Sequence, residues 1–168
     1  MAKRVATGFI LFLGVTFALW FYWTPPLDDD LHYMGYFRDY ILGGGDYPWS
    51  RVKDMIVSEW HANNIRWVNM ITAFTHTVMP KWAVALIHGL CVILIMRWSV
   101  KLAGAKGKLL SILVIIAMIT LCLPWHANLG FMVYAHNYVL PSAVFTGFFI
   151  LWFKRPAYQS PLALTGLL

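Results

Sequence analysis

The sequence predicts an all-α integral membrane protein with about four transmembrane helices and an amphipathic surface helix in its first outer loop. Of the 168 residues, 60% are hydrophobic and only 12% are charged, roughly half the charged fraction of an ordinary soluble domain. One soluble core of this size does not need so much apolar surface. The apolar residues also gather in long runs between short polar segments, which is typical of membrane-spanning helices.

The first predicted span covers residues 5–23, an uninterrupted apolar run. At ~1.5 Å of rise per residue, this run is long enough to cross ~30 Å of hydrocarbon. Lys3 and Arg4 precede it, so a cleaved signal peptide is the alternative. The run is longer than the apolar region of a usual signal peptide, however, and no A-x-A-like cleavage site follows it. We therefore expect a retained membrane anchor.

Three further apolar runs predict the remaining spans. They cover residues 82–96, 109–123 and 139–153. Each run is slightly short for a bilayer crossing, but tryptophan, proline or lysine at its ends extends it into the headgroup region. We therefore expect one span at each of these places.

The distribution of charge orients the four spans. Cations without any acidic residue occupy the segment before the first span, the connection 97–108 and the pair Lys154 and Arg155. If the chain crosses the membrane four times, all three segments lie on the same side of it. That side is cytoplasmic by the positive-inside rule. The acidic first loop, residues 24–81, and the connection 124–138 then share the outer face. The net charge of +6 is therefore explained by topology, and nucleic-acid binding is not expected.

The outer loop 24–81 contains the predicted surface helix. The glycines of "GGG" at 43–45 predict a flexible joint, and Pro48, with Asp46 or Ser50 as a cap, predicts a helix start. Apolar residues then recur at steps of about three and four: Val52, Ile56, Trp60, Trp67, Met70 and Phe74. This spacing predicts one amphipathic helix on the membrane surface, so residues 66–81 are not expected to cross the membrane.

The end of the sequence becomes apolar again in residues 156–168. This is the pattern of the first turns of a further span. We therefore expect residues 1–168 to form a single membrane domain that is the N-terminal part of a longer protein.

The densest negative charge in the chain lies directly past the first span. Asp28, Asp29 and Asp30 stand there, at the predicted depth of the lipid headgroups. Polar residues at a membrane are functional candidates because their burial is costly. Carboxylates near a lipid phosphate either hold a divalent metal ion or deprotonate a substrate hydroxyl. The alternative is a solvated loop that only ends the helix.

Further candidates for a site lie in the same outer loop. His32 and Tyr33 follow the aspartates at once, and aromatic side chains stack on sugars as well as populating membrane interfaces. Arg66, near Asn64, offers a planar fork of donors that grips phosphate, with headgroup snorkelling as the alternative. No histidine spacing matches a metal-ligand motif. A divalent metal ion held by the aspartates stays an open alternative, and no other cofactor is expected.

Three short motifs resemble those of the multi-spanning GT-C glycosyltransferases. The resemblance is to uncharacterised bacterial members with D-D-x-x-Y, N-G-R and N-Y-x-x-P signatures. These stand here as "DDLHY" (Asp29–Tyr33), "NIR" (Asn64–Arg66) and "NYVLP" (Asn137–Pro141). Ile65 replaces the glycine of the second motif. By topology the resemblance covers most of the chain.

The resemblance implies a membrane glycosyltransferase, or a fragment of one, in a bacterial inner membrane. Such an enzyme moves a sugar from a polyprenyl-phosphate donor to a glycan or lipid acceptor on the outer face. The resemblance implies Asp29 or Asp30 as the catalytic base and Arg66 as a phosphate contact. It also implies a set of further substrate-binding residues: Asp28, His32, Tyr33, Asn64, Asn137 and Tyr138. This stretch alone is expected to be inactive.

Two other classes of protein remain open. A transporter or flippase subunit would have polar groups at mid-membrane and helices broken by glycine or proline. His88, followed by Gly89, is the candidate for such a group, although an interhelical hydrogen bond is the commoner role for a histidine in a span. A non-catalytic membrane assembly protein would instead use the acidic loop as a docking surface.

Overall fold

The computed structural model consists of helices in the part of the chain that it describes. That part comprises residues 2–26, 29–62, 68–105, 109–122 and 135–154. The helices are α1 (Ala2–Trp23), α2 (Asp29–Tyr36), α3 (Arg38–Gly43), α4 (Trp49–His61), α5 (Val68–Thr77), α6 (Lys81–Leu102), α7 (Leu109–Cys122) and α9 (Leu140–Lys154), with a π-helical turn, η1 (Ala135–Val139), before α9. The all-α prediction is therefore confirmed.

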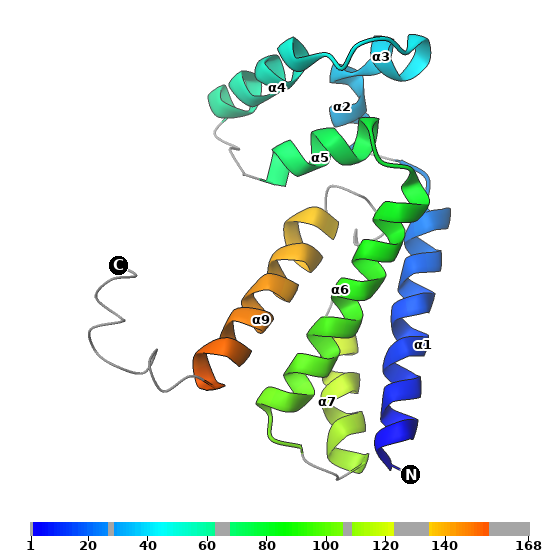
Figure 1. The fold of residues 1–168 in the computed structure, drawn as a ribbon, viewed down its shortest axis with the longest axis vertical. Coiled ribbons are helices and arrows are strands. Elements are labelled where there is room, and N and C mark those ends of the chain that lie inside the picture. Colours follow the sequence, from blue (N-terminus) through cyan, green and yellow to red (C-terminus); the bar gives the residue numbers. More distant parts are fainter. Residues whose placement is uncertain (1, 27–28, 63–67, 106–108, 123–134, 155–168) are drawn as a thin grey trace, which may run out of the picture.

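The helices form two parts, one above the other in Figure 1. Four longer helices, α1, α6, α7 and α9, form the part that we call the body. The shorter helices α2 to α5 lie across one end of the body and form the part that we call the cap. Within the body, α1 packs along α6, and α6 also contacts α7 and α9.

Each predicted span corresponds to one helix of the body. α6 extends the predicted span 82–96 at both ends, and α7 and α9 match their predicted spans to within one residue. α1 over residues 4–23 and the whole of α6 are long and apolar enough to cross a membrane, while α7 is apolar but shorter. Successive helices of the body run in opposite directions, so the N-terminus lies at the end away from the cap (Figure 1).

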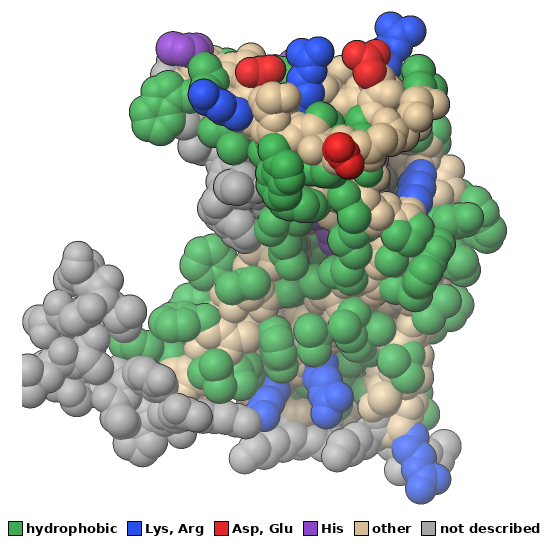
Figure 2. All heavy atoms as spheres, turned by 45° about the horizontal axis from the view of Figure 1, so that its top comes forward, with side chains coloured by type: hydrophobic (Ala, Val, Ile, Leu, Met, Phe, Trp, Pro, Cys, Tyr) green, Lys and Arg blue, Asp and Glu red, His purple; other side chains and the backbone are tan. Residues whose placement is uncertain are grey.

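Charge is divided between the two ends of the molecule. The acidic side chains visible in Figure 2 lie on the cap, whereas lysine and arginine side chains lie at both ends. Arg97 and Lys101 belong to the last turns of α6, at the end of the body that we call the basic end. The fold therefore brings Arg97 and Lys101 to the end opposite the acidic side chains of the cap.

The predicted single surface helix is wrong. α4 and α5 are separate helices, and α2 and α3 precede them where only a loop was expected. α4 buries Val52, Met55 and Glu59, whereas Trp60 of the predicted apolar stripe is 66% exposed. Its buried face packs on other residues of the cap, so contacts within the cap decide which face turns inward. Trp67 lies outside the described residues.

A glycine turn joins α3 to α4. Gly44 and Gly45 have φ values of 69° and 104°, a region that residues with a Cβ atom rarely adopt. The predicted flexible joint therefore has a defined conformation in the structure. α4 begins after Pro48 without a side-chain cap, so the predicted capping by Asp46 or Ser50 is wrong.

Glycines make a close contact between α1 and α6. A Cβ atom on Gly89 would lie 2.8 Å from the Gly14 carbonyl oxygen and 2.8 Å from the Ala18 Cβ atom. A Cβ atom on Gly14 would lie 2.3 Å from Ile93 Cγ1 and 3.1 Å from the Gly89 carbonyl oxygen. Small residues let helix backbones approach closely, and van der Waals packing then holds the pair together in a lipid environment.

Gly89→Ala is expected to destabilise the contact between α1 and α6. The added methyl group meets a backbone oxygen, and overpacking of this kind costs about 1–3 kcal/mol. Gly8→Ala is the matched control, because a Cβ atom there has nothing within 4 Å and alanine favours a helix. Thermal unfolding in detergent measures both variants, and equal melting temperatures would contradict the close crossing.

Candidate functional site

The candidate site lies in the cap, where α2 meets α4. Tyr33 and Phe37 pack against Val52 and Met55 in a small apolar cluster that is separate from the core of the body. α2 also contacts α5. This cluster fixes α2 relative to α4, so the polar residues beside it have defined positions.

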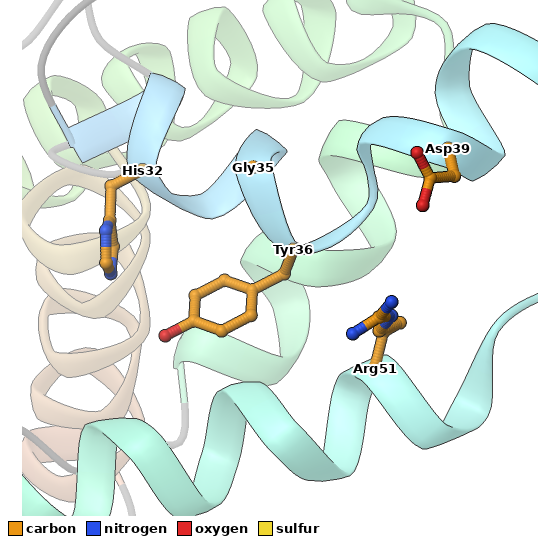
Figure 3. Close-up of a pocket in the computed structure, with 5 residues that line it drawn as sticks. All are labelled: His32, Gly35, Tyr36, Asp39 and Arg51. Atoms are coloured by element: carbon orange, nitrogen blue, oxygen red, sulfur yellow. The ribbon is translucent and has the colours of Figure 1, made fainter.

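A pocket of about 310 Å³ opens between these helices of the cap (Figure 3). α2 contributes His32, Gly35 and Tyr36, and the other lining residues are Asp39 of α3 and Arg51 of α4. In Figure 3 the Arg51 side chain rises from α4 toward α3, and the Tyr36 ring lies between His32 and Arg51. Aromatic rings beside a guanidinium group suit a ligand that carries a sugar or a phosphate.

Four of these lining residues were missed by the sequence analysis. They are Gly35, Tyr36, Asp39 and Arg51, which were not among the predicted site residues. The Arg51 Nη1 atom lies 3.8 Å from Asp54 Oδ2, and both side chains are exposed. A solvent-exposed ion pair of this kind is worth little, so the guanidinium remains available to an anionic ligand.

His32 joins α2 to α4 through a carboxylate. Its Nε2 atom lies 3.2 Å from Glu59 Oε1, and the Glu59 side chain is only 7% exposed. With the proton on Nε2, the imidazole donates a hydrogen bond to this carboxylate. The His32 ring also makes edge-on contacts with Tyr33 and Tyr36, each at a centroid distance of 5.4 Å. Glu59, which the sequence analysis did not select, therefore positions His32 at the pocket.

Asp30 is buried at the junction between the cap and the body. It is 3% exposed, and its negative charge acts on the ammonium group of Lys81 at the start of α6. The Lys81 Nζ atom also donates a hydrogen bond to the Thr24 carbonyl oxygen, just past the end of α1. The hydrogen bond ties the start of α6 to the end of α1, and the charge of Asp30 on α2 lies near enough to act on the same ammonium group. Asp30 was a predicted site residue, whereas Lys81 was not.

A second polar cluster lies in the body beneath α5. His88 of α6 and His136 of η1 are each 1% exposed, and their ring centroids are 4.8 Å apart. Thr72 Oγ1 lies 3.3 Å from His136 Nδ1, and the Phe21 ring contacts His88. In the part of the chain that the structure describes, His88 Nδ1 has no hydrogen-bond partner. The expected interhelical hydrogen bond is therefore not made by this atom.

The predicted site residues fall into two groups within the fold. Asp29, Asp30, His32 and Tyr33 belong to α2, whereas residues 137–138 belong to η1. α5 contacts both of these elements, and it separates the cap pocket from the histidine cluster. For Asp29, the structure describes only that it is the first residue of α2. Asp28, Asn64 and Arg66 lie outside the described residues. Asn137 and Tyr138 do not line the cap pocket.

The chemistry available at the candidate site comes from the side chains of the cap and of its junction with the body. Among the described ranges, no group of three or more histidine, cysteine, aspartate or glutamate residues is arranged to hold a metal ion. No family model, curated protein or solved structure matches the chain. The arrangement combines a buried carboxylate with a cation, a histidine held by a carboxylate, and an aromatic pocket with an arginine.

Lys81→Met is expected to loosen the junction between the cap and the body. It removes the ammonium group that donates a hydrogen bond to the Thr24 carbonyl oxygen and on which the charge of buried Asp30 acts, and a hydrogen bond from a charged group contributes about 1.5–3 kcal/mol. Lys53→Met on the exposed face of α4 is the control. Adding Asp30→Asn to Lys81→Met should recover part of the loss in a double-mutant cycle of thermal unfolding. Strictly additive effects would show that the two residues do not interact.

Proposed function

We propose that the chain is a multi-pass membrane protein in which α1, α6, α7 and α9 all span the bilayer and the cap lies on the extracytoplasmic face. The length and hydropathy of α1 and α6 support this placement, as do the alternating directions of the four helices (Figure 1). Large apolar side chains are exposed on every helix of the body, as expected for contact with lipid: Phe12, Leu86, Leu121 and Phe145. The basic end supports a cytoplasmic N-terminus.

We propose that the protein is a membrane glycosyltransferase, or a fragment of one, that transfers a sugar from a polyprenyl-phosphate donor to a glycan or lipid acceptor at the cap. The observation that carries this proposal is the position of α2. This acidic helix begins six residues after α1 ends at Trp23, so the proposed bilayer holds its carboxylates at the level of a lipid phosphate. α2 also lines the pocket that contains Tyr36 and Arg51, which offers an aromatic face and a cation to such a donor.

The two aspartates of α2 take different roles in this reaction. Asp30 is buried, its charge acts on Lys81, and it positions the helix. Asp29 is the base that accepts the proton of the acceptor hydroxyl. The hydroxyl oxygen forms a bond to the anomeric carbon while the bond from that carbon to the phosphate oxygen breaks, and the phosphate leaves with the electron pair. Arg51 at the pocket and Arg66 are the cations assigned to the phosphate.

Asp29→Asn is expected to lower sugar transfer by at least about 100-fold, the usual contribution of a general base, without changing membrane insertion or thermal stability. Asp30→Asn should lower both activity and stability, because it disturbs the junction. Asp46→Asn, in the exposed turn between α3 and α4, is the control. The assay follows the transfer of labelled sugar from polyprenyl phosphate in membranes that contain the protein.

Two results would contradict this assignment. Wild-type transfer by Asp29→Asn would exclude Asp29 as the base. Loss of transfer on chelation, with recovery on adding a divalent ion, would assign the aspartates to a metal site instead. Either result leaves the membrane topology unaffected.

A transporter or flippase subunit is the second candidate function, and one observation favours it. His88 and His136 are buried together inside the body, and His136 lies in a π-helical turn that precedes α9. Polar groups inside a membrane bundle and irregular helices are typical of transport sites, and π turns are frequent at functional sites.

The variant His88→Phe distinguishes the two functions. It should leave sugar transfer intact if the protein is a glycosyltransferase, but stop lipid translocation across the membrane of proteoliposomes if the protein is a flippase. A non-catalytic assembly protein would show neither activity.

A further inference from the structure

A groove opens between α1 and α6 at the basic end of the body. The two helices touch at Gly14 and Gly89 and then diverge away from the cap, with α7 beside them (Figure 1). The space between them is a groove of about 280 Å³. The close glycine contact and the groove are therefore two consequences of one crossing geometry.

The lining of the groove is aliphatic except at one end. Ile10 of α1, Ile93 of α6 and Ile112 of α7 are among its walls, and Thr7 and Arg97 are its polar residues. Arg97 is exposed, and it is the charged residue among the described side chains that line the groove. The groove thus combines a hydrocarbon surface with one accessible guanidinium group.

Arg97 stands at the depth of the lipid headgroups in the proposed bilayer. It follows Lys81, the first residue of α6, by 16 residues, a rise of about 24 Å along a helix. The hydrocarbon core of a bilayer is ~30 Å thick. With Lys81 near one polar boundary, Arg97 therefore lies close to the other, while Ile93 and Ile10 face the acyl region of the same leaflet.

We propose that this groove binds one anionic phospholipid from the leaflet opposite the cap. An acyl chain lies along the aliphatic walls, where burial against isoleucine replaces contact with bulk lipid. The lipid phosphate pairs with the Arg97 guanidinium, whose planar fork of donors matches phosphate oxygens. Charge complementarity selects an anionic headgroup over a zwitterionic one. This inference rests on the proposed membrane placement of α1 and α6 but not on sugar transfer.

Lipid titration of the delipidated protein in detergent tests the proposal. Native mass spectrometry counts bound lipid, and thermal unfolding reports its stabilising effect. One equivalent of dioleoylphosphatidylglycerol is expected to bind about fivefold more tightly than dioleoylphosphatidylcholine, the usual effect of one arginine near an anionic lipid. Arg97→Gln should remove this preference. Lys101→Gln, an exposed cation one turn further along α6 that does not line the groove, should retain it.

A steric pair of variants tests the groove without changing its charge. Thr7→Trp fills the groove and should lower binding of both lipids, whereas Gly8→Trp adds the same side chain at a neighbouring position with open space around it. Equal affinity for the two lipids, an equal loss in Lys101→Gln, or unchanged binding in Thr7→Trp would overturn the proposal. A dimer that Thr7→Trp dissociates, with no lipid bound, would assign the groove to a second copy of the chain. None of these results affects the test of Asp29.

Discussion

The close crossing of α1 and α6 is the constraint on which the rest of the described structure depends. Because Gly14 and Gly89 bring the two backbones into contact, the cap ends of both helices are held side by side. Lys81 can then reach the Thr24 carbonyl oxygen, and its ammonium group meets the charge of Asp30. The position of α2, and of the pocket residues on it, follows from this junction.

Two apolar clusters lie on either side of that junction. The larger cluster fills the body, and the smaller one holds α2 against α4 in the cap. Between them lie polar groups, namely buried Asp30, whose charge acts on Lys81, and Thr72 beside His136. Buried polar groups are tolerated when they are paired, and a layer of this kind suits a ligand with a charged group on a long apolar chain. The lipid-linked donor that we propose has this character.

The body of the fold could be predicted from the sequence, whereas the details of the cap could not. An apolar run is a local pattern, so each run identified its own helix within a few residues. α2 and α3 are too short and too mixed in polarity for periodicity to reveal them. The face that α4 buries depends on the residues it packs against in the cap, and no local pattern in the α4 sequence identifies those residues.

The candidate site was predictable only where its residues stand together in the sequence. The acidic run identified Asp30, but Lys81 lies far along the chain and no spacing connects the two. His88 was singled out as a polar residue within a span, yet its neighbour His136 was assigned to an outer loop. Contacts between distant segments depend on how the helices cross, and a single sequence does not show how they cross.

The π-helical turn η1 has a consequence for how the chain tolerates insertions and deletions. A π turn accommodates one residue more than an α-helical turn, and here that turn holds Ala135 and His136 inside while α9 continues with Ala143 and Ile150 buried. Removing one residue after His136 in η1 would therefore close the π turn to an α-helical turn, and the imidazole of His136 would keep its place beside Thr72. Removing one residue within α9, which has no such extra residue, would instead turn His136 by about 100° relative to the rest of that helix.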